Sequence, residues 1–204
     1  MSSTQLDEFP QQILELEKLE YLDLSYCKIR ILPQEIDKLI NLKTLKLWGN
    51  SIEIIPTSIG NLKKLEVLDL YNNKINHIPK EIGAMNNLRE IMMGSIEDNQ
   101  NQITEIPNEI GQLKKLETIH LGNNKLSSLP ISIKDCISLK NIILWGNEFK
   151  HIPIWLSEMN LDELNFFINK IEHLPENYKW LNKVKSLTLD FHLDKEMKPK
   201  WKLW

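Results

Sequence analysis

Proline recurs along this chain at an almost constant interval, and that interval constrains the fold more than any other feature. Successive prolines lie 23, 23, 23, 28, 23, 23 and 22 residues apart, and only Pro199 stands outside the series. The members of the series are Pro10, Pro33, Pro56, Pro79, Pro107, Pro130, Pro153 and Pro175. A fixed period of this length is typical of repeat architectures, in which each unit contacts mainly its neighbours. We therefore expect an array of stacked units.

Alignment on the prolines gives one unit, L-x-x-L-x-L-x-x-N-x-I-x-x-I-P-x-x-I-x-x-L-x-x, with copies that begin at residues 19, 42, 65, 88, 116, 139 and 161. The L-x-L pair alternates with period two, which predicts a short strand with one buried face. The later I-P-x-x-I-x-x-L segment has apolar residues every three to four positions. It predicts a loop or a short 3₁₀ or helical turn on the outer side. One unit alone cannot bury its apolar residues, so neighbouring units must stack.

A column of polar residues follows the predicted strands. A carboxamide at each turn can bond backbone groups of adjacent turns, which buried irregular backbone requires. We predict that this column is a structural ladder formed by Cys27, Asn50, Asn73, Asn101, Asn124, Asn147 and Asn169.

The repeated pattern resembles the leucine-rich repeat family, from about Leu6 to about Phe191. The 23-residue unit is similar to the subclass found in intracellular adaptors and many bacterial repeat proteins. The resemblance implies an α/β repeat solenoid: a curved horseshoe segment with a parallel β-sheet on its concave face and loops or short 3₁₀ or helical turns on its convex face. It also implies a non-catalytic protein–protein interaction module without a cofactor.

The two ends and the fourth repeat depart from the pattern. Residues 1–18 match half a repeat and are expected to form an improvised cap; a longer array or another chain covering that end are the alternatives. Seven repeats fill residues 19–183, and residues 184–204 supply a last strand and a C-terminal cap. In that cap Trp201, Leu203 and Trp204 are expected to form a hydrophobic lid. A tail that binds a membrane surface or an acidic partner is the alternative.

The fourth repeat contains five extra residues within 94–100. Inserted loops of repeat proteins often carry binding contacts, although a tolerated polar loop costs little. The candidate contacts in this insertion are Ser95, Ile96, Glu97, Asp98 and Asn99.

The residues between the strand leucines point away from the core, so we expect their identity to be free of folding constraints. Trp48 with Tyr71, and Trp145 with Phe167, are expected to form two exposed aromatic patches that flank a notch at two glycines, Gly94 and Gly122. Exposed aromatic residues are enriched at binding hot spots, although they also stack on one another in strands. The predicted partner-binding residues on the concave face are Tyr21, Asp23, Lys46, Trp48, Asp69, Tyr71, Met92, His120, Ile143, Trp145, Asn165 and Phe167.

Composition and motifs disfavour other classes of function. A formal charge of -3 and a pI near 6.0 argue against nucleic-acid binding, and no apolar run is long enough to span a membrane. The sequence contains no phosphate loop, nucleophile elbow or zinc motif, so we expect neither an enzyme nor a metal site. His77, His151 and His173 are expected to be solvated, and Cys27 and Cys136 to be unbonded structural thiols.

The partner is expected to be a protein whose identity the sequence does not reveal. A carbohydrate or small-ligand receptor, in which the aromatic residues form a platform, and a regulatory subunit of a separate enzyme remain the alternatives. No secretory signal is visible, so a cytoplasmic location is expected, with delivery outside the cell by another route left open. Heavy use of Ile, Lys and Asn favours a bacterial source.

Overall fold

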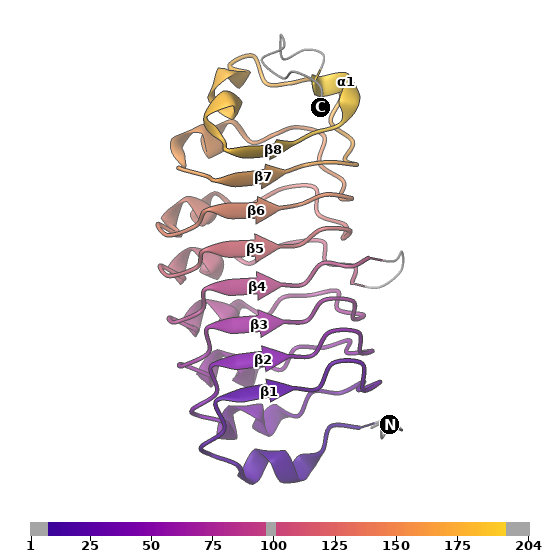
Figure 1. The fold of residues 1–204 in the computed structure, drawn as a ribbon, viewed down its shortest axis with the longest axis vertical. Helices are drawn as coiled ribbons and strands as arrows, with labels where there is room; N and C mark the ends of the chain where they lie inside the picture. Colours follow the sequence, from indigo (N-terminus) through magenta and orange to yellow (C-terminus); the bar gives the residue numbers. More distant parts are fainter. Residues whose placement is uncertain (1–7, 97–100, 195–204) are drawn as a thin grey trace.

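The computed structural model describes residues 8–96 and 101–194, which form one ladder of stacked repeats (Figure 1). Eight strands form a single open, parallel sheet in which each strand pairs with the next along the chain. Figure 1 shows them following one another in a nearly straight, uncurled column. The strands are β1 (Tyr21–Asp23), β2 (Thr44–Lys46), β3 (Val67–Asp69), β4 (Glu90–Met92), β5 (Thr118–His120), β6 (Asn141–Ile143), β7 (Glu163–Asn165) and β8 (Ser186–Thr188).

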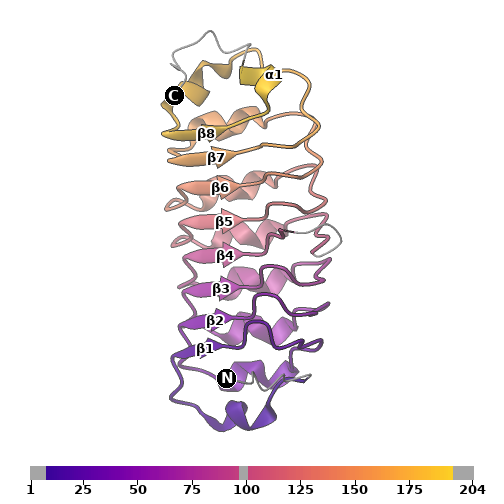
Figure 2. The same ribbon diagram turned by 45° about the vertical axis from the view of Figure 1, so that its right-hand side comes forward.

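A row of short 3₁₀ helices lies behind the sheet (Figure 2). The residue before each of the first seven is a proline in extended conformation, which ends the preceding segment and carries no N–H that would need a partner. A single α-helical turn, α1 (Phe191–Asp194), follows the last strand. The 3₁₀ helices are η1 (Gln11–Glu15), η2 (Gln34–Lys38), η3 (Thr57–Asn61), η4 (Lys80–Ala84), η5 (Asn108–Gln112), η6 (Ile131–Asp135), η7 (Ile154–Glu158) and η8 (Tyr178–Lys183).

The apolar core fills the space between the sheet and this row of helices. The central residue of each strand pairs in register with its equivalent in the next, as Leu45 does with Leu68, and both are fully buried. The 3₁₀ helices pack so closely that a Cβ on Gly83 would lie 2.4 Å from the carbonyl oxygen of Glu109 in the next repeat. Glycine at this position therefore permits the close approach of η4 to η5.

The asparagine column bonds each repeat to the one before it. The carboxamide oxygen of Asn124 accepts a hydrogen bond from the amide of Ile103 at 2.9 Å. Its Nδ2 donates to the carbonyl oxygens of Met93 at 3.0 Å and Leu121 at 3.1 Å. At the first position of the column, the thiol of Cys27 donates only to its own turn, in contact with the Ser25 oxygen at 3.4 Å. The carboxamides thus satisfy backbone groups in two successive repeats at once.

The ends of the array are covered by apolar side chains from outside the strands. Phe9 and Leu14 are buried beneath the first repeat, while Trp180 and Leu193 are buried at the other end. The predicted lid of Trp201, Leu203 and Trp204 lies outside the described residues and stays a prediction. Within the described ranges, no helix has the length and apolar character needed to cross a membrane.

Candidate functional site

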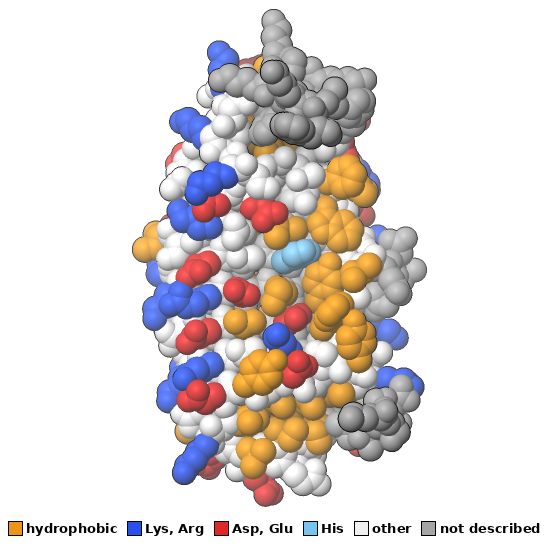
Figure 3. All heavy atoms as spheres, in the orientation of Figure 1, with side chains coloured by type: hydrophobic (Ala, Val, Ile, Leu, Met, Phe, Trp, Pro, Cys, Tyr) orange, Lys and Arg blue, Asp and Glu red, His pale blue; other side chains and the backbone are white. Residues whose placement is uncertain are grey.

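Aromatic rings follow the carboxyl ends of the strands and form one nearly continuous column on the outward surface of the sheet, which we call the strand face (Figure 3). Tyr26 and Trp48 have ring centroids 5.1 Å apart, and Trp48 meets Tyr71 edge to face at 6.2 Å. Tyr71 in turn meets His120 at 5.1 Å. We define the aromatic column as Tyr26, Trp48, Tyr71, His120, Trp145 and Phe167.

The predicted notch at Gly94 and Gly122 is wrong, because neighbouring rings fill it. A Cβ on Gly94 would lie 2.6 Å from the Tyr71 ring and 2.7 Å from the His120 ring. A Cβ on Gly122 would lie 2.3 Å from Nε1 of Trp145. The missing side chains therefore provide seats for the rings of adjacent strands, and the two expected patches become one surface.

The rings differ in how much of them solvent reaches. Trp48, Tyr71 and Trp145, predicted to be exposed, are half-buried against their neighbours. Phe167 is 43% exposed at one end of the column, and Tyr26 is 61% exposed at the other. Solvent therefore reaches mainly the ring edges in the middle of the aromatic column and the more exposed rings at its two ends.

Tyr26 is a member of the column that the sequence analysis missed. It occupies the second position after the last strand leucine, where the chain takes a left-handed turn: φ is 57° at Tyr26, 68° at Gly49 and 51° at Asn72. Glycine and asparagine adopt this conformation readily, and their recurrence at this position was the available signal. Ile168 fills the same position near the other end, with φ of 54° and 57% of its surface exposed.

Polar residues in alternate strands hold the turn that carries the rings. Asp23, Asp69 and Asn165 each accept a hydrogen bond from the amide two residues later at 3.0 Å. His120 accepts the equivalent bond through Nδ1 at 3.4 Å. The expectation that these positions are free of folding constraints is therefore wrong for these four residues, because each supports its own turn.

Charges on the first three strands alternate across the sheet. The pairing places Lys46 between Asp23 and Asp69, and its Nζ lies 5.8 Å from the centroid of the Tyr21 ring. Burial acts to raise the pKa of Asp23, but hydrogen bonds from Ser25 and Tyr21, with Lys46 nearby, hold it below its usual value.

Asp69 and His120 are the titratable groups that burial affects most on this face. Burial raises the pKa of Asp69, against the opposing effects of the Tyr71 amide and of Lys46. Burial also lowers the pKa of His120, so its ring is neutral at pH 7 and packs as an aromatic group. The remaining predicted residues of the strands, Met92 and Ile143, are half-buried between these groups.

The insertion in the fourth repeat is only partly a surface loop. Ser95 is buried, its amide donates to the Gly122 oxygen at 2.9 Å, and its Oγ accepts from the Asn101 amide at 3.0 Å. It is therefore a structural turn residue, and its prediction as an accessible contact is wrong. Ile96 is 62% exposed, and Glu97, Asp98 and Asn99 lie outside the described residues.

A column of alternating charge borders the strand face on its other side and was missed in the sequence analysis. Blue and red side chains alternate along this edge in Figure 3. Lys43 pairs with Glu20 at 2.8 Å, and Arg89 pairs with Glu66 at 3.8 Å and also with Glu117. The sequence showed this alternation at one position, because the residue after the first apolar residue of each repeat is alternately acidic and basic. We call these residues the ionic column: Glu20, Lys43, Glu66, Arg89, Glu117, Lys140, Asp162 and Lys185.

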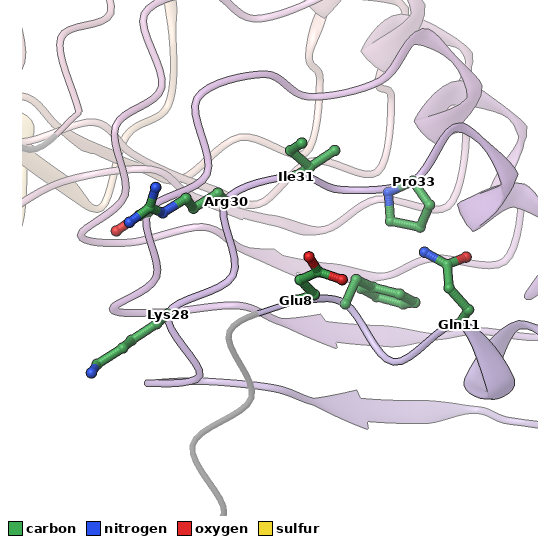
Figure 4. Close-up of a pocket in the computed structure, with 8 residues that line it drawn as sticks. Glu8, Gln11, Lys28, Arg30, Ile31 and Pro33 are labelled. Atoms are coloured by element: carbon green, nitrogen blue, oxygen red, sulfur yellow. The ribbon is translucent and has the colours of Figure 1, made fainter.

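Among the hollows in the described residues, two of the largest lie away from the strand face. One of about 850 Å³ lies between the N-terminal cap and the first repeat, where Lys28 and Arg30 extend away from Glu8 (Figure 4). The other, of about 690 Å³, is lined by His151, His173 and His192. In the part of the chain that the structure describes, no three His, Cys, Asp or Glu side chains are grouped to hold a metal ion. Neither hollow gathers groups that would define a cofactor site.

Comparison with protein families decides the relationship of this chain. A family model described as a leucine-rich repeat region matches residues 1–103, and a second model, Leucine Rich Repeat, matches residues 115–136. The chain belongs to the leucine-rich repeat family. Leucine-rich repeat proteins bind protein partners, and the family is typically non-catalytic. A comparison with curated proteins found no match.

Solved leucine-rich repeat structures resemble the whole array. A leucine-rich repeat protein of Leptospira interrogans is 33% identical, with a TM-score of 0.81 over 90% of this chain and 46% of that one. The ectodomain of the Arabidopsis thaliana receptor kinase GASSHO1/SCHENGEN3, solved in complex with CASPARIAN STRIP INTEGRITY FACTOR 2, is 29% identical. Its TM-score is 0.77 over 89% of this chain and 22% of that one.

An internalin of Listeria monocytogenes shares the fold at 22% identity, with a TM-score of 0.73 over 94% of this chain and 59% of that one. The chain thus spans less than two thirds of each of these proteins. The similarity to the Leptospira protein agrees with the expected bacterial origin.

Proposed function

We propose that this leucine-rich repeat chain is a non-catalytic module that binds a protein partner on the strand face, along the aromatic column. The observation that carries the proposal is the continuity of the column, from Tyr26 through Trp48 and Tyr71 to His120. Large aromatic side chains that lie together on a surface supply much of the binding energy at protein interfaces. The half-buried rings are already ordered by their neighbours, so a partner that covers them would immobilise few side chains.

The ring geometry favours a protein over a carbohydrate. A sugar stacks on an open ring face, whereas the rings of this column lie at 50°, 90° and 77° to their neighbours. The indole Nε1 of Trp48 is buried without a hydrogen-bond partner among the described residues. It is therefore not presented to a ligand hydroxyl, and the surface suits apolar and cationic protein side chains better.

The experiment is capture of partners from a lysate of the native cell, followed by titration of the purified partner. A Trp48→Ala, Trp145→Ala double variant is compared with wild type and with Ile54→Ala, a matched control that removes an exposed apolar side chain from outside the strand face. We expect the double variant to weaken binding by at least about 2 kcal/mol and the control to bind as wild type. Equal affinity of the correctly folded double variant would exclude the aromatic column as the binding site.

A further inference from the structure

The strand face has an aspartate at a position where an asparagine in another repeat accepts the same hydrogen bond. Asp69 accepts the amide of Tyr71 at 3.0 Å, and Asn165 accepts the amide of Phe167 at the same distance four repeats later. Only 9% of Asp69 is exposed, so its charge is costly to keep in the folded chain. The turn does not require that charge.

One oxygen of Asp69 is left for another group. Its Oδ1 holds the Tyr71 amide, and no hydrogen bond or ion pair reaches Oδ2 from the residues that the structure describes. Asp23 lies two strands away on the same row, and Glu90 lies on β4 next to β3. This part of the face therefore combines a buried, half-satisfied carboxylate with two further carboxylates.

The outward positions of the eight strands are negative as a set. They carry four carboxylates, Asp23, Asp69, Glu90 and Glu163, against one cation, Lys46. The ionic column beside them compensates its own charges, because acidic and basic side chains alternate along it. The negative charge thus belongs to the surface that borders the aromatic column.

This surface already holds one cation of the chain itself. The Nζ of Lys46 lies 5.8 Å from the centre of the Tyr21 ring, between the strands that carry Asp23 and Asp69. No carboxylate among the described residues lies within ion-pair distance of that Nζ. The lysine is therefore stabilised by the Tyr21 ring and by the longer-range attraction of the two aspartates. The same combination suits a cation from a partner.

We propose, building on the proposed function, that the partner segment bound to the strand face is basic. Its arginine or lysine side chains lie against Trp48 and Tyr71 and reach the carboxylates of Asp69 and Asp23. Arginine fits this chemistry better than lysine, because its planar guanidinium stacks on aromatic rings and donates hydrogen bonds in the ring plane to a carboxylate.

The test uses four short labelled peptides in which glycine alternates with arginine, lysine, glutamine or glutamate, titrated against the full chain by fluorescence anisotropy. The arginine probe is expected to bind most tightly, the lysine probe less tightly, and the glutamine and glutamate probes at least about tenfold more weakly than arginine. Added salt should weaken binding of the arginine probe.

The decisive variant is Asp69→Asn, because Asn165 shows that asparagine preserves the turn. We expect it and Trp48→Ala each to weaken binding of the arginine probe about tenfold or more. Glu53→Gln, which removes an exposed carboxylate from outside the strand face, is the matched control and should bind as wild type.

Three outcomes overturn the inference. The first is binding of the glutamine probe as tight as that of the arginine probe, and the second is equal binding of the arginine probe by Asp69→Asn and wild type. The third is failure of all four probes to bind. The proposed function is tested separately by capture with the Trp48→Ala, Trp145→Ala variant. A partner lost in that variant but kept by Asp69→Asn would leave the proposed function standing without the basic partner.

Discussion

Substitution of a single ladder carboxamide, Asn124→Ala, tests whether the column of asparagines holds the repeats together. The side chain is 3% exposed and bonds the amide of Ile103 and the carbonyl oxygens of Met93 and Leu121, with a longer bond to the Gly122 oxygen at 3.4 Å. In the alanine variant the Met93 and Leu121 oxygens each keep a hydrogen bond from the carboxamide of a neighbouring ladder asparagine, so the amide of Ile103 is the buried group that loses its partner. An unsatisfied buried group costs about 1–3 kcal/mol. We therefore expect a loss of about 1–3 kcal/mol in the free energy of unfolding.

The assay is urea denaturation followed by circular dichroism, with hydrogen exchange to locate the loosened repeats. Asn76→Ala is the matched control, because it removes an exposed asparagine from the third repeat and is expected to change stability by less than about 0.5 kcal/mol. Exchange should accelerate first in the two repeats that Asn124 joins. An unchanged denaturation midpoint for Asn124→Ala would refute the reasoning that these bonds stabilise the stack.

Four further substitutions test other parts of the structure. Asp69→Asn should be at least as stable as wild type at pH 7. Burial raises the pKa of Asp69, so the folded state binds the carboxyl proton more tightly than the unfolded state does. Wild-type stability therefore falls as pH rises through that raised pKa. In urea melts at several pH values, the advantage of the variant should vanish below the ordinary aspartate value of 3.8, and an advantage that persists there would contradict this cause. Gly83→Ala should cost about 1–3 kcal/mol in thermal unfolding because its Cβ meets the Glu109 backbone. Gly122→Ala should mainly displace the Trp145 side chain and increase acrylamide quenching of tryptophan fluorescence. Equal stability of the two variants would argue against rigid packing at Gly83. Glu117→Lys places a cation between Arg89 and Lys140 in the ionic column. It should lower the free energy of unfolding by about 0.5–1 kcal/mol at low salt and by less at high salt. A loss of stability that does not depend on salt would exclude an electrostatic origin.

The fold could be predicted from the sequence because each of its determinants recurs at a fixed position in the repeat. The buried strand residues, the proline before each of the first seven 3₁₀ helices and the asparagine after six of the strands depend on local geometry that recurs along the array. The position of the insertion was predictable as well, but the burial of Ser95 was not. Ser95 keeps the place in the turn that Asn72 and Asn123 occupy in the flanking repeats, so the extra residues begin only after it.

The details of the strand face depend on contacts between repeats, which a comparison of equivalent positions does not reveal. The neighbours of Trp48 and Trp145 followed from strand order, but the direction of a ring depends on whether the residue after an adjacent strand has a side chain. Tyr71 leans onto Gly94, and Trp145 covers Gly122. The same limitation concealed the charge alternation of the ionic column, which becomes visible only when one position is followed through all eight repeats.

Several residues of the strand face reduce the stability of the fold, and their location supports binding as the reason they are there. Ile168 adopts a left-handed conformation that costs about 1 kcal/mol for a residue with a side chain, although glycine or asparagine serves at this position in four of the other repeats. It is also 57% exposed and so gains little from burial. Tyr26 bears the same backbone cost, which its stacking on Trp48 partly offsets. Together with the buried charge of Asp69, these costs lie along one surface, next to rings that are already ordered. A chain selected for stability alone would place glycine and asparagine at these positions, so these costs support the proposal that a partner covers the strand face.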